Sequence, residues 1–102
     1  MNKKFMLEAL KQAKKALKKQ EVPIGAVIVK DNKIITKGYN QIESKKDSTK
    51  HAEIIVIQKA SKKLKNWRLN NCDIYVTLEP CTMCAAAIEL SRIKNVYYCL
   101  SK

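Results

Sequence analysis

The sequence predicts an α/β fold in which a mixed sheet carries helices on both faces, giving three layers. The elements follow one another as helix, hairpin, helix, strand, helix and strand. Strands separated by helices favour parallel pairing with right-handed crossovers, whereas the two strands of a hairpin pair antiparallel. A chain of 102 residues has the length of one domain, so we expect these elements to share one folded unit.

The first helix is predicted from residue 3 to about residue 20, because apolar residues recur there at three- and four-residue spacing. Lysines fill the other faces, and Asn2 is placed to cap the first turn. We interpret the segment as an amphipathic helix that covers the sheet. The lysine spacing does not distinguish a solvated face from one that touches RNA. The predicted buried stripe is Phe5, Met6, Ala9, Leu10, Ala13, Ala16 and Leu17.

A β-hairpin is predicted next. Residues 24–29 form a short, β-branched strand after Glu21-Val22-Pro23, which ends the helix. Asp31-Asn32 is a two-residue turn, and both residue types tolerate the positive φ that hairpin turns require. The partner strand runs over residues 34–40. Residues 41–50 are polar and are predicted to form a loop.

The second half of the chain alternates helices with strands. Ser48 or Thr49 is predicted to cap a helix that begins near His51. The buried stripe of this helix is predicted as Ile54, Ile57, Ala60 and Leu64, with Val56 beside them. The remaining elements are a strand at 74–78, a helix from 81 to about 91 and a strand at 95–100.

His51, Cys81 and Cys84 lie at helix starts, where sheets of this kind form sites. If Pro80 opens its helix, the two cysteines share one face of the first turn. The free N–H groups and the helix dipole there favour thiolates, which bind zinc. We interpret these three side chains as one metal site with Glu53 as an acid/base beside it. Three protein ligands would leave the fourth zinc position open for water.

Several alternatives compete with this interpretation. A Cys-x-x-Cys pair also occurs in redox sites, in structural zinc sites and as buried thiols, and a lone histidine is often structural. A closed zinc site with Cys72 or Cys99 as the fourth ligand is the specific rival. We favour the open site because neither of these cysteines lies at a helix start.

The charge and composition constrain partner and location. The net charge of +12 favours polyanion binding, but only two of the 21 basic residues, Arg68 and Arg92, are arginine. Such a lysine skew is equally explained by base composition of the genome. No apolar run approaches the roughly 18 residues of a membrane-spanning helix, and the lysine-rich start does not resemble a signal peptide. The expected compartment is the cytoplasm, where four cysteines are thiols or ligands.

The motif His51-Ala52-Glu53, followed by Pro80-Cys81-Thr82-Met83-Cys84, is the signature of zinc-dependent nucleobase deaminases. The similarity also includes residues 21–29, 38–40 and 69–93, which is nearly the whole chain. On these residues the chain resembles the bacterial tRNA-specific adenosine deaminases, and guanine deaminases come close.

The resemblance implies a cytidine deaminase-like fold, one Zn²⁺ per chain, a homodimer and a tRNA anticodon stem-loop as substrate. The implied reaction converts the wobble adenosine to inosine. Alternatives are a cytosine- or guanine-type base or nucleotide deaminase, and an inactive zinc-bearing module that binds RNA or partners a longer subunit. The roles implied are zinc ligation by His51, Cys81 and Cys84, proton transfer by Glu53, and substrate binding by Asn40, Val22 and Pro23.

Three departures from the family pattern are visible. The family usually has alanine in place of Lys50 and glycine in place of Ala86. The family also continues beyond the fourth strand with helical segments. We therefore expect residues 1–102 to form a single zinc deaminase domain that lacks this C-terminal part and leaves its last strand exposed at an edge. Asn40, Val22 and Pro23 also have plainer explanations, as residues that close turns.

Overall fold

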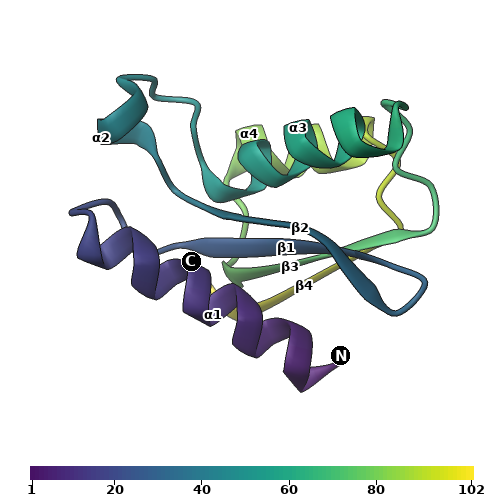
Figure 1. Ribbon diagram of the computed structural model, residues 1–102, viewed down its shortest axis with the longest axis horizontal. Helices are drawn as coiled ribbons and strands as arrows, with labels where there is room; N and C mark the ends of the chain where they lie inside the picture. Colours follow the sequence, from purple (N-terminus) through teal and green to yellow (C-terminus); the bar gives the residue numbers. More distant parts are fainter.

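A computed structural model describes residues 1–102 and shows a four-stranded mixed sheet between helical layers (Figure 1). The strand order is β2-β1-β3-β4. The first strand pairs antiparallel with both neighbours, whereas β3 and β4 are parallel. The elements are α1 (Lys3–Lys18), β1 (Gly25–Lys30), β2 (Lys33–Tyr39), α2 (Ile42–Lys45), α3 (Ala52–Leu64), β3 (Cys72–Leu78), α4 (Thr82–Leu90) and β4 (Asn95–Leu100).

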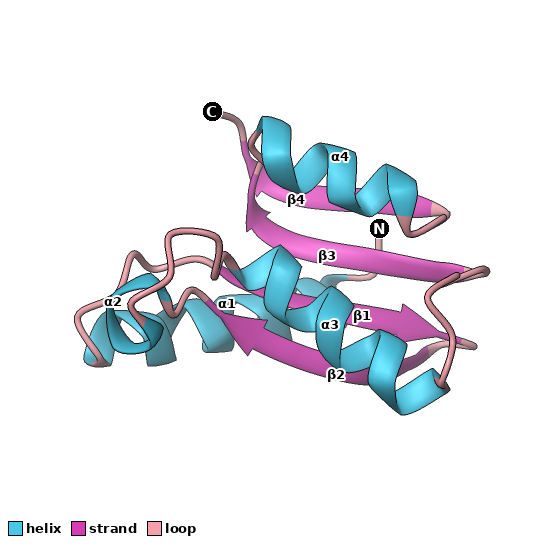
Figure 2. Cartoon of the chain, turned by 90° about the horizontal axis from the view of Figure 1, so that it is seen from above, coloured by secondary structure: helices cyan, strands magenta, loops and turns pink.

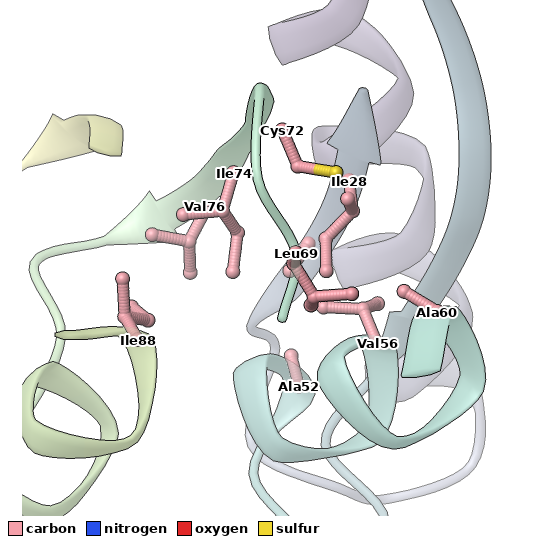
Figure 3. Packing of buried hydrophobic residues seen from close by; sticks show 10 residues of the cluster. Ile28, Ala52, Val56, Ala60, Leu69, Cys72, Ile74, Val76 and Ile88 are labelled. Atoms are coloured by element: carbon pink, nitrogen blue, oxygen red, sulfur yellow. The ribbon is translucent and has the colours of Figure 1, made fainter. Parts of the chain in front are cut away.

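The sheet is covered by α1 on one face and by α3 and α4 on the other, which confirms the three layers (Figures 1 and 2). Alternate residues of β1 enter the two cores. Val27 packs in the cluster under α1, and Ile28 packs on the opposite face with Val56 and Leu69 (Figure 3). A strand buried on both faces has no polar alternation, which is why this run is continuously apolar.

The first helix is confirmed, and Asn2 caps it by accepting a hydrogen bond from the backbone N–H of Lys4 at 2.9 Å. Its predicted stripe is too wide, because Leu10 and Leu17 are exposed. The buried stripe instead includes Gln12, together with small alanines such as Ala9. Small side chains on this face let the helix backbone approach β1 closely.

The hairpin turn is as predicted, with φ of 52° at Asp31 and 60° at Asn32. Two other predictions are wrong. The predicted loop at 41–50 contains the one-turn helix α2. In α3, Val56 and Ala60 are buried as predicted, but the buried isoleucine is Ile55 rather than Ile54. Ile57 and Leu64 are partly buried against the core.

The position of α3 has a packing reason. Gly38 on β2 has no side chain, and a Cβ there would lie 3.0 Å from Ile55 Cγ2 and 3.2 Å from Val56 Cγ1. The helix therefore packs over this gap, with the side chains of Ile55 and Val56 directed toward the sheet. Neighbouring residues on the helix circumference, such as Ile54, are consequently turned partly out.

The strand β4 lies at one edge of the sheet, as expected. Its alternate residues Val96, Tyr98 and Leu100 are all exposed. No helix in the structure combines the length and hydropathy that crossing a membrane requires.

Gly25 marks the closest approach between α1 and the sheet. A Cβ at this position would meet Ala9 O, would lie 2.5 Å from Ala13 N and would lie 2.7 Å from Gln12 Cβ. Because two of these atoms belong to the helix backbone, α1 would have to move. We predict that Gly25→Ala lowers the free energy of unfolding by about 3 kcal/mol, measured by chemical denaturation. A loss below about 0.5 kcal/mol would contradict this close approach.

Candidate metal centre

Three side chains that are far apart in the sequence converge at the starts of α3 and α4. The ligand atoms of His51, Cys81 and Cys84 all lie within 4.8 Å of one another. The Nδ1 atom of His51 is 3.5 Å from Cys84 Sγ and 3.7 Å from Cys81 Sγ. Cys84 is fully buried, whereas His51 and Cys81 are half-buried. Solvent therefore reaches the cluster through His51 and Cys81 rather than through Cys84.

The two helix starts position these residues. His51 and Cys81 are the N-cap residues of α3 and α4, with extended backbone and no side-chain capping bond. Pro80 does not open the helix but lies just before it, because Cys81 is the cap and α4 begins at Thr82. Both side chains are consequently free to turn toward each other. Cys84 still lies one turn further along the helix, on the same face.

The donor set fits zinc. With Zn–N near 2.05 Å and Zn–S near 2.3 Å, tetrahedral coordination requires an N···S separation of about 3.5 Å. The two observed separations, 3.5 and 3.7 Å, agree with this value. One imidazole nitrogen and two sulfurs are also ligands that Zn²⁺ prefers. The residues present therefore fit one zinc ion in both chemistry and N···S spacing.

The closed four-ligand alternative is wrong for this structure. Cys72 is buried in the hydrophobic core between the sheet and the helices. Cys99 is exposed, and its thiol donates to the carbonyl of Thr77. Neither joins the ligand cluster, which contains three protein donors. Three donors leave one tetrahedral position available for a non-protein ligand.

Glu53 lies in the first turn of α3 beside this cluster and is only 4% exposed. Burial raises the pKa of its carboxyl group, while its own backbone N–H, His51 and Cys84 act in the opposite direction with smaller effect. Burial also raises the pKa of the Cys84 thiol, with the charge of Glu53 adding to the effect. A cation at the cluster opposes these shifts, because it stabilises both the thiolate and the carboxylate.

Asn40 performs the capping role predicted for Ser48 or Thr49. Its side-chain Oδ1 accepts the backbone N–H of Ala52 at 2.7 Å, while Thr49 bonds to Asp47 instead. The Asn40 side chain is almost completely buried. Because Oδ1 is occupied by the helix, the amide is held in one orientation. The Nδ2 donors and the second lone pair of Oδ1 remain for another molecule.

We predict that Asn40→Ala lowers the free energy of unfolding by about 1–2 kcal/mol, since the buried Ala52 N–H loses its acceptor. Asn40→Asp is the matched variant, because a carboxylate oxygen can accept the same N–H. Urea denaturation should therefore show most of this stability recovered in Asn40→Asp. Equal losses in both variants would argue against the capping bond.

Val22 and Pro23 lie exposed in the turn between α1 and β1. The next residue, Ile24, accepts the backbone N–H of Asn40 at 3.1 Å. This bond joins the turn to Asn40, the residue that follows β2. Neither Val22 nor Pro23 makes a hydrogen bond to a metal-ligating residue.

Glu21 is a further organising residue, and the sequence pattern does not single it out. It is 5% exposed, and its carboxylate accepts the backbone N–H groups of Glu43 at 3.0 Å and Ser44 at 2.8 Å. Burial raises the pKa of this carboxyl group, but the N–H donors outweigh it, so the pKa is lowered. The only sequence signal is an acidic residue just beyond a helix C-terminus, where the dipole disfavours negative charge.

Comparison with known proteins agrees with this fold and with a zinc-binding site. Residues 1–100 match the family described as the cytidine and deoxycytidylate deaminase zinc-binding region. The chain therefore belongs to this family of zinc-binding deaminase domains.

The relatives within the family are more specific. A tRNA-specific adenosine deaminase from Aquifex aeolicus is 48% identical over 99 residues, which is 96% of this chain and 66% of the relative. The Bacillus subtilis tRNA-specific adenosine deaminase is 51% identical over 94 residues, covering 92% of this chain and 58% of the relative. This chain thus spans about three fifths of the length of these curated relatives.

Two solved structures are also similar. One comes from a study of A-to-I editing by tRNA:A34 deaminases at the wobble position of transfer RNA, with a TM-score of 0.97 and 48% identity over 99% of this chain and 73% of the other. The second is a guanine deaminase from Bacillus subtilis, with a TM-score of 0.95 and 40% identity over 99% of this chain and 66% of the other. Both similarities confirm the predicted fold.

Proposed function

We propose that this chain catalyses the zinc-dependent hydrolytic deamination of the wobble adenosine of a tRNA, giving inosine and ammonia. The observation that carries the proposal is the cluster of His51, Cys81 and Cys84 with the buried carboxyl of Glu53 beside it. The substrate class is supported by the tRNA-specific adenosine deaminases that are about half identical to this chain.

Each residue has a defined task in this proposal. His51, Cys81 and Cys84 hold the zinc ion, which when bound acidifies water and so supplies a nucleophile at neutral pH. Glu53 accepts a proton from the attacking water and delivers it to the purine ring nitrogen next to C6. Glu53 then takes the second proton from the oxygen that is now bound to C6 and delivers it to the departing amino group. Water and adenosine thereby become inosine and ammonia.

The remaining residues position the base. A base inside a stacked helix is out of reach, so the substrate adenosine turns out of its loop into the site. Asn40 presents its Nδ2 donor to an acceptor on the nucleoside, and the bond from Ala52 N–H to its Oδ1 holds the amide in place. Val22 and Pro23 form the wall on the β1 side. The net charge of +12 attracts the tRNA phosphates.

The test is incubation of the zinc-loaded chain with transcribed tRNA, followed by detection of inosine at the wobble position. We expect inosine only with the base unpaired in its loop. A folded, zinc-loaded chain that produces none would overturn the proposed activity.

A second candidate is guanine deamination, favoured by the 40% identity with a Bacillus subtilis guanine deaminase. The two functions differ in the size of the substrate. Release of ammonia from free guanine in the absence of RNA would support the second candidate, and inosine in tRNA would support the first.

We further propose that the active form is a homodimer in the cytoplasm, a compartment that contains tRNA and keeps ligand cysteines reduced. The outer face of α4 supports self-association. Met83 and Leu90 are 37% and 66% exposed, and the exposed Ala86 lies between them. Sedimentation velocity should give twice the chain mass, and Leu90→Glu should shift it toward the monomer.

A further inference from the structure

The largest surface groove does not lie over the metal centre but beside it, along the outer side of α3. Its volume is about 770 Å³, and the segment around α2 forms the opposite wall. The lining residues are Gln41, Lys45, Lys50, Ile55, Ile57, Gln58, Lys59, Ser61 and Lys62.

The groove carries four lysines and no acidic side chain. Ion pairs in this chain join Glu8 to Lys11 and Lys37, away from the groove. None of the groove lysines is therefore neutralised by a carboxylate within the chain.

Two of these lysines are held by neutral partners. Lys50 Nζ donates to Gln58 Oε1 at 3.2 Å, and Lys59 Nζ donates to the carbonyl of Lys37 at 2.9 Å. Neutral acceptors fix the position of an ammonium group but leave its full charge. Lys45 and Lys62 make no side-chain hydrogen bond and can turn toward a ligand.

Hydrogen bonds hold the wall of the groove in place. The carboxylate of Glu21 fixes α2 through the N–H groups of Glu43 and Ser44. The backbone N–H of Gln41 donates to the carbonyl of Lys50 at 2.9 Å and closes the base of this segment. A ligand would therefore meet a groove that is already formed, which lowers the entropic cost of binding.

The positions of the charges indicate an extended ligand. Lys50 immediately precedes the metal-ligating His51, whereas Lys62 lies near the other end of α3. At 1.5 Å per residue these charges spread over about 18 Å, too far for one phosphate ion. A chain of phosphates matches this spacing, and the apolar side chain of Ile57 provides a surface for sugar rings.

We propose that the groove between α2 and α3 binds the phosphodiester backbone of the RNA whose base enters the metal centre. The proposal rests on the proposed function, because it gives the RNA a defined path past the site. Lysine contacts to phosphates carry no sequence information, so this groove holds and orients the RNA without selecting it.

The test compares two double variants. Lys45→Gln/Lys62→Gln removes two groove charges that make no bond within the chain. Lys4→Gln/Lys14→Gln removes two charges from α1, on the opposite face of the sheet (Figure 1). Both variants have the same net charge, so a general electrostatic effect would be equal in the two. Thermal unfolding checks that both remain folded.

The measured quantity is the affinity of the zinc-loaded chain for transcribed tRNA over a range of salt concentrations. The groove variant should reduce the slope of log affinity against log salt by about 1.5. If the two proteins bind equally at about 1 M salt, this change corresponds to about thirtyfold weaker binding near 0.1 M salt. The control should change the slope much less.

Each outcome is decisive. Equal weakening in the two variants, or none in either, would overturn the groove as the RNA path. A change in sedimentation of the groove variant with unchanged RNA affinity would assign the groove to a second copy of the chain instead. Groove-specific weakening without inosine formation by the unaltered chain would leave the groove standing and reject the proposed deamination.

Discussion

Glu53→Gln is expected to lower the rate of inosine formation by a factor of about 10²–10⁴ and to leave the zinc content unchanged. Glutamine has nearly the same shape as glutamate, so the buried position near Cys84 stays filled. It cannot accept a proton from water at neutral pH, so the proton transfer is lost. The measurements are inosine formed per chain in transcribed tRNA and zinc per chain by atomic emission.

Glu89→Gln is the matched control, since Glu89 is exposed on α4 and touches no part of the metal centre. It should deaminate at the rate of the unaltered chain. Full activity in Glu53→Gln would exclude proton transfer by this carboxylate. If the unaltered chain and the Glu53→Gln variant bind RNA equally and neither deaminates it, the protein is instead the inactive zinc-bearing module.

Cys84→Ser is expected to reduce bound zinc from about one ion per chain to nearly none after dialysis. A serine hydroxyl stays protonated near neutrality and is a poor zinc ligand, and two remaining donors do not form a stable site. Loss of the ion also removes its contribution to stability. A ligand present at about 1,000 times its dissociation constant stabilises the folded state by about 4 kcal/mol, so added zinc should no longer raise the unfolding temperature.

Cys99→Ser provides the comparison, because it removes an exposed thiol outside the ligand cluster. This variant should bind zinc and respond to zinc as the unaltered chain does. If Cys84→Ser kept its zinc, or if Cys99→Ser lost it, the assignment of the ligand set would be wrong.

The elements that could be predicted from the sequence depend on neighbouring residues. The hairpin turn at Asp31-Asn32 is correct because the two residue types accept the left-handed backbone that the turn requires. The cap by Asn2 is correct because its partner, the N–H of Lys4, is two residues away. In both cases the controlling interaction lies within a few positions of the chain.

The errors occur where a distant residue decides the outcome. Gly38 leaves room for Ile55 to turn into the core in place of Ile54, next to the correctly predicted Val56. No residue of α3 indicates that β2 lacks a side chain at this position. Helical periodicity allows several stripes of similar width. Only the surface opposite the helix selects one of them.

The metal centre combines both kinds of information. The residue types and their positions at helix starts indicate zinc chemistry from the sequence, because the one histidine and the Cys-x-x-Cys pair each fall at the start of a predicted helix. The convergence of His51 on Cys84, to 3.5 Å, depends on how α3 and α4 lie side by side on the sheet. The distance could be anticipated only through the family resemblance.

Backbone preferences and side-chain chemistry along short stretches are enough to set the order of the elements, the hairpin and the chemical nature of the site. Three-dimensional packing settles that Asn40 caps α3, that Glu21 holds α2 and that four lysines share one groove. The bonds of Asn40 and Glu21 join residues 12 and 22 positions apart. Such contacts arise only when packing of the sheet and helices brings their elements together.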